Sequence, residues 1–500
     1  MRALLLGLTL LCVLLAPPVH AVDAALAQRI AAGDNDEKIA ALATIVTAAD
    51  PKDIPFLQSM AEGTVTVDGK PVEITVNNRL RREIEGAIAA LKLVDPDRAT
   101  RLAAAKELSG GAEPGILPAV KKALSIEKDP EIKPLLEAIM ATIGIKSTDK
   151  AERLAAIKTL GASNSPTSRA LLAELKDDPD VEIKAQSQRA LKEVESRLAW
   201  AERAGLLFAG ISLGSILLLA ALGLAITYGL MGVINMAHGE LIMIGAYTTY
   251  LVQNLFRAHF PGAFDAYLLF AVPAAFAASM LVGMALERTV VRFLYGRPLE
   301  TLLATWGISL MLIQAVRTIF GAQNVQVENP SWMSGGLEIL TGVVLPYSRI
   351  VIIAFAATVL VGIGLLLAKT RLGLFVRGVT QNRAMASCVG VPTARVDLWA
   401  FGLGSGLAGL AGCALSQIGN VGPDLGQSYI VDSFLVVVVG GVGQLAGTVL
   451  AALGLGIVNK LLETWAGAVI AKIVVLVFII LFIQKRPQGM FAMKGRAVES

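Results

Sequence analysis

The stretch that decides the fold reads TYGLMGVINMAHGELIMIGAY and runs from Thr227 to Tyr247. One hydrophobic segment stops within it and another starts, beside several glycines, and three polar residues fall close together: Asn235, His238 and Glu240. Polar side chains at membrane depth are costly and usually face the protein interior or water, and broken helices expose backbone groups beside cavities. The stretch predicts the edge of a solute pathway, with helix capping at the cytoplasmic interface as the alternative. A proton relay is disfavoured, because one His–Glu pair has no chain of further ionisable groups.

The apolar segments around this stretch are each near the roughly 20 residues that a hydrocarbon core needs. A further apolar stretch, 431–460, is interrupted by GGVG at 440–443. The segments that can span cover approximately residues 205–231, 233–255, 266–288, 301–319, 350–368, 397–418 and 466–484.

Basic residues crowd three connections, at 288–297, 369–395 and 485–496, so all three are predicted to face the cytoplasm. A chain that starts outside and ends inside needs an odd number of crossings. The stretch 431–460 gives seven crossings in total if it is a re-entrant hairpin and nine if its two halves each cross.

The 500 residues are 55% hydrophobic and 17% charged, which excludes a wholly soluble, disordered or disulfide-built protein. Residues 1–21 combine a short basic start, an apolar run and a small-residue cleavage pattern, which predicts a signal peptide, with an uncleaved anchor helix as the alternative. Residues 22–203 carry about 26 basic and 29 acidic side chains, against about 17 and 11 in residues 204–500. The prediction is an exported domain (22–203), a transmembrane domain (204–492) and a cytoplasmic tail (493–500).

The exported domain is predicted to be helical, because apolar residues recur at helical spacing between Asp-Pro or Gly-rich breaks. Three stretches resemble one another: KIAALATI at 38–45, RLAAAKEL at 101–108 and RLAAIKTL at 153–160. The segment 64–76 alternates around Asp68-Gly69 like a β-hairpin. A soluble HEAT-like repeat domain fits this spacing, with an irregular helical bundle as the alternative. The domain has no metal-ligand spacing or nucleophile motif and is interpreted as a binding or assembly surface.

A second informative stretch, RLGLFVRGVTQNRAMASCVGVPTARVD, runs from Arg371 to Asp397. Its middle, Arg377 to Val389, alternates with helical period and is bounded by Gly390 and Pro392, which predicts a short interfacial helix. As the alternative, the basic residues of this loop serve only to set the membrane topology. The ordered polar pattern favours an additional docking role. No GxxxxGK[ST] loop occurs in the sequence, so the energy source is expected on another subunit.

Four ordered motifs resemble the permease subunits of the branched-chain amino-acid class of ABC importers over about residues 205–492. They are the Thr227–Tyr247 stretch, RGVTQNRAMASCVGV from Arg377, GGVGQLAGT at 440–448 and KRPQGMF at 485–491. Within that class, GRPLETLLATWGISL at 296–310, GAQNVQVENPSWMSGG at 321–336 and the long exported domain resemble the urea-transporting branch.

The resemblance implies an all-α protein, a polytopic permease preceded by the soluble repeat domain, in the bacterial cytoplasmic (inner) membrane with its N-terminal domain in the periplasm. It also implies a second homologous permease subunit, two ATP-binding subunits that hold the ATP, and a periplasmic solute-binding protein, with no cofactor on this chain. The family's coupling helix, which receives ATPase motion, is carried over onto Arg377, Gln381, Asn382, Met385, Ala386 and Gly390. The net charge of +4 is too small to argue for nucleic acid.

The predicted solute is urea, with branched-chain amino acids or short amides as alternatives. A function of a different class is also possible, that of a membrane-anchored assembly or sensor protein. The sequence contains no set of residues typical of an active site, so an enzyme is disfavoured. Urea is neutral, so its path needs paired donors and acceptors more than charge. The candidate pathway residues are Thr227, Asn235, His238, Glu240, Gln417 and Asn420. The glycine-rich segments 403–412 and 440–443 are expected to serve close helix packing, with pivots as the alternative.

Overall fold

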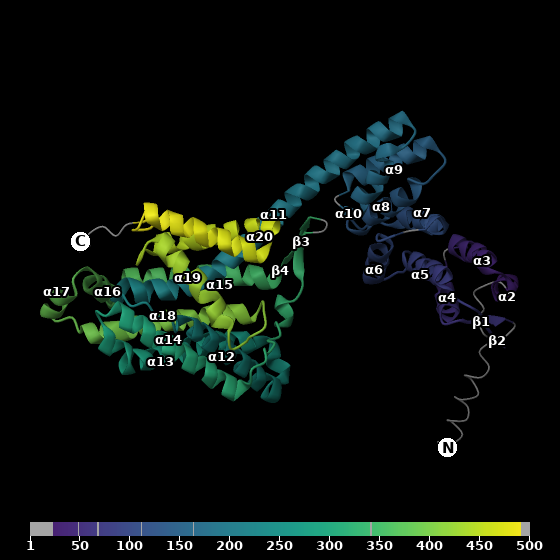
Figure 1. Cartoon of the computed structure of the whole chain (residues 1–500). Coiled ribbons are helices and arrows are strands. Elements are labelled where there is room, and N and C mark those ends of the chain that lie inside the picture. The colour runs from purple at the N-terminus through teal and green to yellow at the C-terminus, as the bar shows by residue number, and fades with distance from the viewer. Residues whose placement is uncertain are drawn as a thin grey trace, which may run out of the picture. The chain divides into compact units, whose positions relative to one another are not determined.

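The computed structural model describes residues 24–48, 50–67, 70–111, 113–163, 165–340 and 343–491. The chain divides into two compact units, Met1–Trp200 and Ala201–Ser500 (Figure 1). The predicted signal peptide and the tail 493–500 lie outside the described residues. Each unit is built mainly from α-helices, so the two are described in turn.

The helices of the first unit recur as triplets in which a short helix joins two longer ones. A preceding helix, α2, covers Ala24–Ala32. The triplets are α3 (Asn35–Ala48), α4 (Ile54–Ala61) and α5 (Asn78–Lys92), then α6 (Arg98–Leu108), α7 (Leu117–Ile126) and α8 (Ile132–Gly144), then α9 (Lys150–Ala162), α10 (Pro166–Glu174) and α11 (Val181–Met231). Short 3-10 turns precede or follow the short helices: η1 (Pro51–Asp53), η2 (Pro114–Ile116) and η3 (Leu175–Asp177).

The first triplet carries an inserted β-hairpin between its short helix and its last helix. Strand β1 (Thr64–Val67) pairs antiparallel with β2 (Lys70–Glu73), and Val65 lies opposite Val72. Val65 is fully buried against the helices, which follows from the alternation of apolar and polar residues in the strand. The predicted turn residues 68 and 69 lie outside the described residues.

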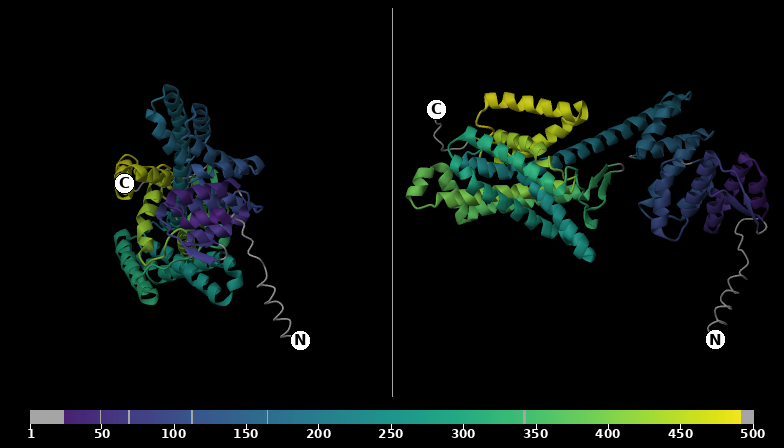
Figure 2. Two further views of the ribbon diagram at one scale, coloured as in Figure 1. Left: turned by 90° about the vertical axis from the view of Figure 1, so that its right-hand side faces the viewer. Right: turned by 60° about the horizontal axis from the view of Figure 1, so that its bottom comes forward.

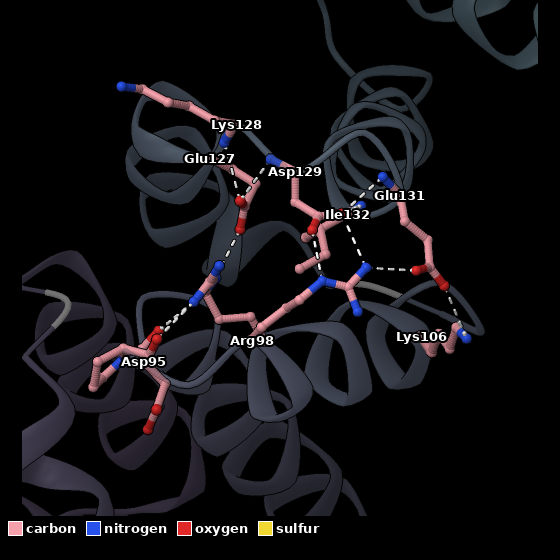
Figure 3. Close-up of polar contacts among 10 residues, drawn as sticks. Asp95, Arg98, Lys106, Glu127, Lys128, Asp129, Glu131 and Ile132 are labelled. Atoms are coloured by element: carbon pink, nitrogen blue, oxygen red, sulfur yellow. Dashed lines mark hydrogen bonds and ion pairs between the residues drawn. The ribbon is translucent and has the colours of Figure 1, made fainter.

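Equivalent ion pairs support the repetition of the last two triplets. Arg98, at the start of α6, lies 2.6 Å from a carboxylate oxygen of Asp129 and 2.7 Å from one of Glu131 in the turn before α8 (Figure 3). The hydrogen bonds from Arg98 and from the Glu131 backbone lower the pKa of Asp129 to about 2. About fifty residues later the same arrangement recurs, where Lys150 of α9 lies 2.9 and 2.8 Å from the carboxylates of Asp180 and Glu182.

The second unit contains the hydrophobic half of the chain. After α11 come α12 (His238–His259), η4 (Pro261–Ala266), α13 (Tyr267–Thr289), η5 (Val291–Leu294), α14 (Pro298–Phe320), η6 (Ser331–Met333), β3 (Gly336–Leu340), β4 (Val343–Pro346), α15 (Tyr347–Lys369), α16 (Arg371–Gln381), α17 (Arg383–Cys388), α18 (Thr393–Ser416), α19 (Leu425–Gly440) and α20 (Leu445–Lys485). Strands β3 and β4 form an antiparallel hairpin that was not predicted from the sequence.

Helix α18 is the central helix of this unit, and every residue from Gly404 to Ser416 is buried. Its glycines allow three other helices to approach closely: Gly404 faces Gly223 of α11, Gly409 faces α13, and Gly412 faces α12. A Cβ atom at Gly404 would lie 2.6 Å from both the Gly223 carbonyl oxygen and a methyl carbon of Thr227. Because α18 is continuous, the glycines of 403–412 serve close packing and do not interrupt the helix.

The second unit has two distinct ends. One, the α16–α17 end, carries those two helices, and the other, the β3–β4 end, carries the hairpin (Figure 1). At the β3–β4 end, Arg317 of α14 forms an ion pair of 2.8 Å with Asp424. At the α16–α17 end, the chain after α20 returns to α19, since the Met490 amide donates to the Val439 carbonyl at 2.8 Å.

The stretch 431–460 forms parts of two helices, and the turn between them lies at the α16–α17 end. Gly441 and Gly443 adopt φ values of +98° and +77°, and Gly443 packs against Gly229 near the end of α11. The glycines of 440–443 therefore make a tight turn, which their freedom at positive φ permits. The predicted close packing also occurs there.

Six helices of the described residues are long and apolar enough to cross a membrane. They lie within Val181–Gly229, Pro261–Thr289, Leu299–Phe320, Tyr347–Lys369, Thr393–Ser416 and Leu445–Lys485. The last helix bends at Gly467, where φ is +80° (Figure 2). Helix α12 (22 residues), the shorter apolar helix α19 (16 residues) and the division of α20 by this bend bring the described helical segments from Ala201 onward that can contribute crossings to nine. Nine crossings would result if each of these segments crosses, and this count stays a prediction.

Candidate functional site

The break between α11 and α12 is held by side chains of its own segment and of α14. Gly232 turns the chain at φ +65°, and the Asn235 Oδ1 atom accepts a hydrogen bond of 3.1 Å from the Ala237 amide. The Thr305 hydroxyl of α14 accepts from the Met236 amide at 3.1 Å. Thr305 is nearly fully buried, so this contact fixes the break against α14. Thr305 was not among the residues predicted from the sequence, although Thr301, Thr305 and Ser309 recur at helical spacing in an apolar segment.

The three polar residues of the break are buried and each leaves one polar atom without a partner in the structure. The side chains of Asn235, His238 and Glu240 are exposed by only 2%, 0% and 2%. The atoms without a partner are Asn235 Nδ2, His238 Nδ1 and Glu240 Oε2. A buried polar atom without a hydrogen bond costs about 1–3 kcal/mol, so a water molecule or a passing solute would be bound favourably here.

The same three residues point toward different neighbours. His238 Nε2 lies 3.0 Å from the Ala220 carbonyl oxygen of α11, whereas Glu240 is within hydrogen-bonding reach of Ser309 on α14. Two positions along an α-helix differ by about 200° around its axis, which explains the divergence. The His238 ring must carry its proton on Nε2 to bond a carbonyl, which leaves Nδ1 as an acceptor in the neutral ring. The polar residues therefore do not converge on one point: His238 faces α11 and Glu240 faces α14.

Thr227 is placed for packing more than for solute contact. Its hydroxyl donates within its own helix, 3.1 Å from the Leu224 carbonyl oxygen and 3.3 Å from that of Gly223. Its methyl group faces Gly404, and the side chain is fully buried. The structure thus gives the Thr227 hydroxyl no spare hydrogen-bonding capacity as a donor.

Gln417 and Asn420 line a cavity of about 300 Å³ at the β3–β4 end. Gln417 follows the last residue of α18, and its Oε1 atom lies 3.1 Å from the Tyr267 hydroxyl. Two further amide side chains line the same cavity, Gln326 and Asn329, and the Asn329 Oδ1 atom is buried with no partner in the part of the chain that the structure describes. The cavity also contains Ser348, Arg349 and Ser416.

The predicted pathway residues therefore fall into two groups. Asn235, His238 and Glu240 lie at the break between α11 and α12, while Gln417 and Asn420 lie at the opposite, β3–β4 end. The structure does not bring the two groups together into one site. Gln326 and Asn329 lie in the loop GAQNVQVENPSWMSGG and were not predicted as pathway residues; their amide character was the signal that could have identified them.

The predicted coupling helix is two helices. Helix α16 begins at Arg371, earlier than the predicted Arg377, and the chain breaks at Asn382 before α17. Asn382 adopts an extended conformation, and its Oδ1 atom accepts a hydrogen bond of 2.9 Å from the Met385 amide. The side-chain cap stabilises a new helix start, which explains why one helix does not continue through the loop.

Most of the predicted coupling residues are accessible. Met385 is 61% exposed, Gln381, Asn382 and Gly390 are exposed, and the exposed Arg377 donates to the Leu367 carbonyl. Ala386 is buried at 6% exposure and packs against the core of the unit, so it supports the loop from within.

Two other motifs of the sequence analysis contact each other. The tail KRPQGMF reaches the turn GGVG, where Met490 bonds Val439 and Phe491 lies against Gly441 and Gly447. Gly489 is at φ +74° in this contact. The two motifs thus form one packed structure at the α16–α17 end. Among the described residues, no group of three His, Cys, Asp or Glu side chains is arranged to hold a metal ion.

The apolar helices and the buried polar break define the second unit as a multi-pass helical membrane protein. Comparison of the sequence with known families is more specific. The chain belongs to the family described as "Branched-chain amino acid transport system / permease component", whose match covers residues 206–483. The match begins after the first unit, so the family accounts for the second unit alone.

Individual relatives agree with this family. Over 290 residues the chain is 30% identical to the high-affinity branched-chain amino acid transport system permease protein BraD of Pseudomonas aeruginosa, covering 56% of this chain and 92% of BraD. Over 293 residues it is 28% identical to the corresponding permease protein LivH of Escherichia coli K12, covering 57% and 93%. The probable LivH of Methanocaldococcus jannaschii is 26% identical over 293 residues, covering 55% and 88%. No solved structure matches the chain.

Proposed function

We propose that this permease subunit carries urea or a closely related short amide, and that the cavity at the β3–β4 end is where the solute enters. The amide side chains of Gln326, Asn329, Gln417 and Asn420 in the cavity lining carry the proposal. Urea has four N–H donors and one carbonyl acceptor, and amide side chains supply both acceptors and donors. Asn329 lines the cavity and its Oδ1 atom has no partner among the described residues, so this atom can accept from such a solute once the side chain rotates into the cavity.

The charges around the cavity favour a neutral solute. Among the described residues that line it, Arg349 is the one charged side chain, and none is a carboxylate. An amino-acid zwitterion brings an ammonium group that costs several kcal/mol to desolvate unless a carboxylate or several carbonyl groups pair with it. The apolar lining is limited to Val327, Pro346 and Ile418, which offers a branched side chain little enclosure.

Branched-chain amino acids are the second candidate. The relatives are named as branched-chain amino acid permeases, and the family match at residues 206–483 covers most of the second unit. A membrane-anchored assembly protein is disfavoured, because an anchor needs neither nine helical segments nor buried polar atoms without partners.

The proposed complex contains a second homologous permease subunit, two ATP-binding subunits that hold the ATP, and a periplasmic solute-binding protein. We assign the α16–α17 end to the cytoplasm, because Lys369, Arg371 and Arg377 cluster there and basic residues favour the inner side. With nine crossings, this orientation leaves residues 22–203 in the periplasm of a bacterial inner membrane. The α16–α17 loop would then contact the ATP-binding subunits.

The repeat domain is proposed to act in assembly or receptor docking. Stacked helical repeats offer extended surfaces for protein partners, and its ion pairs are used between its own helices. Deleting residues 24–195 while keeping the export signal is expected to lower uptake without changing which solute is carried. A changed solute preference would show instead that the repeat domain holds specificity.

The test of the proposed solute is energy-dependent uptake of labelled urea and labelled leucine in cells with and without this chain, with its partner subunits present in both. Loss of urea uptake alone supports the proposal. Loss of leucine uptake would agree with the family and contradict urea as the solute. If neither uptake is lost, the alternative of a membrane-anchored assembly protein is favoured.

A further inference from the structure

Arg383, the first residue of α17, is tied to a buried carboxylate of the central helix. Its guanidinium forms an ion pair with Asp397 of α18, and its Nη1 atom lies 3.3 Å from the Asp397 Oδ1 atom. The Asp397 side chain is 0% exposed, whereas that of Arg383 is 43% exposed. Separating the pair would leave the Asp397 carboxylate buried without a counter-charge, which strongly destabilises a protein. The ion pair therefore holds the α16–α17 loop against α18.

The same guanidinium contacts the connection between α13 and α14. Its central carbon lies 5.0 Å from the centre of the Tyr295 ring, within range of a cation–π interaction. The Tyr295 hydroxyl donates a hydrogen bond of 2.8 Å to Glu287 of α13, which is 3% exposed, and lies 3.7 Å from the Met231 sulfur at the end of α11. One side chain of the loop thus reaches three membrane helices, directly or through Tyr295.

The packing around Tyr295 extends to the break between α11 and α12. Tyr295 packs with the buried side chains of Val233, Val291 and Phe401. Val233 belongs to the break, two residues before Asn235, and Phe401 lies one helical turn after Asp397 on α18. The ion pair and this cluster therefore form a continuous contact path from the exposed loop to the polar break.

We propose that Arg383 is a positioning residue that transmits displacement of the α16–α17 loop to α18 and, through Tyr295, to the break between α11 and α12. The inference rests on the proposed function, since it assumes that ATP-binding subunits move this loop. A loop held to the bundle by backbone alone would absorb such a displacement. The bidentate ion pair and the stacked ring provide a stiff contact, because both restrict the orientation of the guanidinium plane.

The test uses the complete transporter reconstituted in lipid vesicles and measures ATP hydrolysed per solute molecule accumulated. Tyr295→Phe removes one hydroxyl and keeps the ring. Loss of this hydrogen bond loosens the contact between the loop and α13 and is expected to raise the ratio of ATP to solute severalfold, with the solute KM unchanged. Arg383→Lys keeps the charge but loses the planar fork, so it is expected to raise the ratio at least as much.

Tyr250→Phe serves as the matched control, because Tyr250 is half-buried in α12 outside this cluster and should leave the ratio unchanged. Normal ratios for Tyr295→Phe and Arg383→Lys in correctly inserted protein would overturn the proposal. Equal losses of uptake and ATP hydrolysis, with a lowered melting temperature, would also overturn it by showing a purely structural role.

The ratio is measured with urea and with leucine in parallel. A wild-type complex that hydrolyses ATP and accumulates leucine alone contradicts the proposed solute, yet the variants still test Arg383 with leucine as the transported molecule. The failure of one proposal is thereby distinguished from the failure of the other.

Discussion

Replacing Asn329 by alanine separates a solute contact from a structural one. Asn329 lines a cavity of about 300 Å³, and its Oδ1 atom is buried with no hydrogen-bond partner among the described residues. If this side chain stabilised the protein in the absence of solute, its Oδ1 atom would accept a hydrogen bond from another residue. An unsatisfied buried acceptor costs about 1–3 kcal/mol, so Asn329→Ala is expected to leave the melting temperature unchanged or to raise it.

The effect on transport is expected to have the opposite sign. A hydrogen bond from urea to Asn329 would contribute about 1 kcal/mol, so its loss is expected to raise the KM for urea about fivefold. The assay is initial urea uptake as a function of concentration in cells that contain the whole transporter, with the melting temperature measured on the purified complex. Asn324→Ala is the control, because Asn324 is exposed in the same loop and does not line the cavity.

An unchanged KM together with a lowered melting temperature would refute this reasoning, since the carbonyl would then support the fold and not the solute. A similar rise in KM for Asn324→Ala would also refute it, because the effect would belong to the loop as a whole.

Three further perturbations follow from the described contacts. The hydrogen bonds to Asp129 hold its pKa near 2 against an ordinary 3.8, so the stability that they give is complete above about pH 4 and is lost as the pH falls toward 2. Hydrogen exchange around the start of α8, corrected for the intrinsic rate, should therefore rise as the pH falls over that range. Asp129→Asn should show the faster exchange already at pH 7. Gly412→Val would push a side chain into the α12 backbone at Ile242 and is expected to cost about 1–3 kcal/mol of stability, whereas Gly307→Ala in α14, with nothing within 4 Å, should be tolerated; melting temperatures in detergent decide between them. Arg377→Glu reverses an exposed charge on the α16–α17 loop and is expected to abolish ATP-driven uptake while the protein stays in the membrane; normal uptake would count against the coupling assignment.

The membrane segments were predictable because hydropathy depends on composition and not on long-range contacts. The break near Gly232 and the glycine packing of α18 were also visible, since only glycine permits a close helix approach or a positive φ at little cost. The hairpin β1–β2 follows a period-two alternation that is readable in the sequence.

Other features depended on tertiary contacts. The hairpin β3–β4 was missed because its apolar residues, such as Leu337 and Val344, resemble the start of the following membrane helix. The break at Asn382 depends on a side-chain cap that competes with helix continuation.

The polar pathway shows the same limit most clearly. Neighbours in sequence such as His238 and Glu240 point to different helices, whereas Asn329 and Gln417 are distant in sequence and line one cavity. Sequence proximity therefore suggested one site where the structure has two groups. The convergence of amides at the β3–β4 end became evident only once the loop after α14 and the end of α18 were placed side by side, as in the antiparallel bridge between Val325 and Val421.

The central claim is that this chain forms the path for urea in an ATP-driven importer. Its most direct test is accumulation of labelled urea in vesicles that contain the complete complex, with the solute-binding protein outside and ATP supplied to the ATP-binding subunits. The account predicts accumulation above the external concentration that stops without ATP and is not competed by excess leucine. Accumulation of leucine with no ATP-dependent accumulation of urea would contradict it.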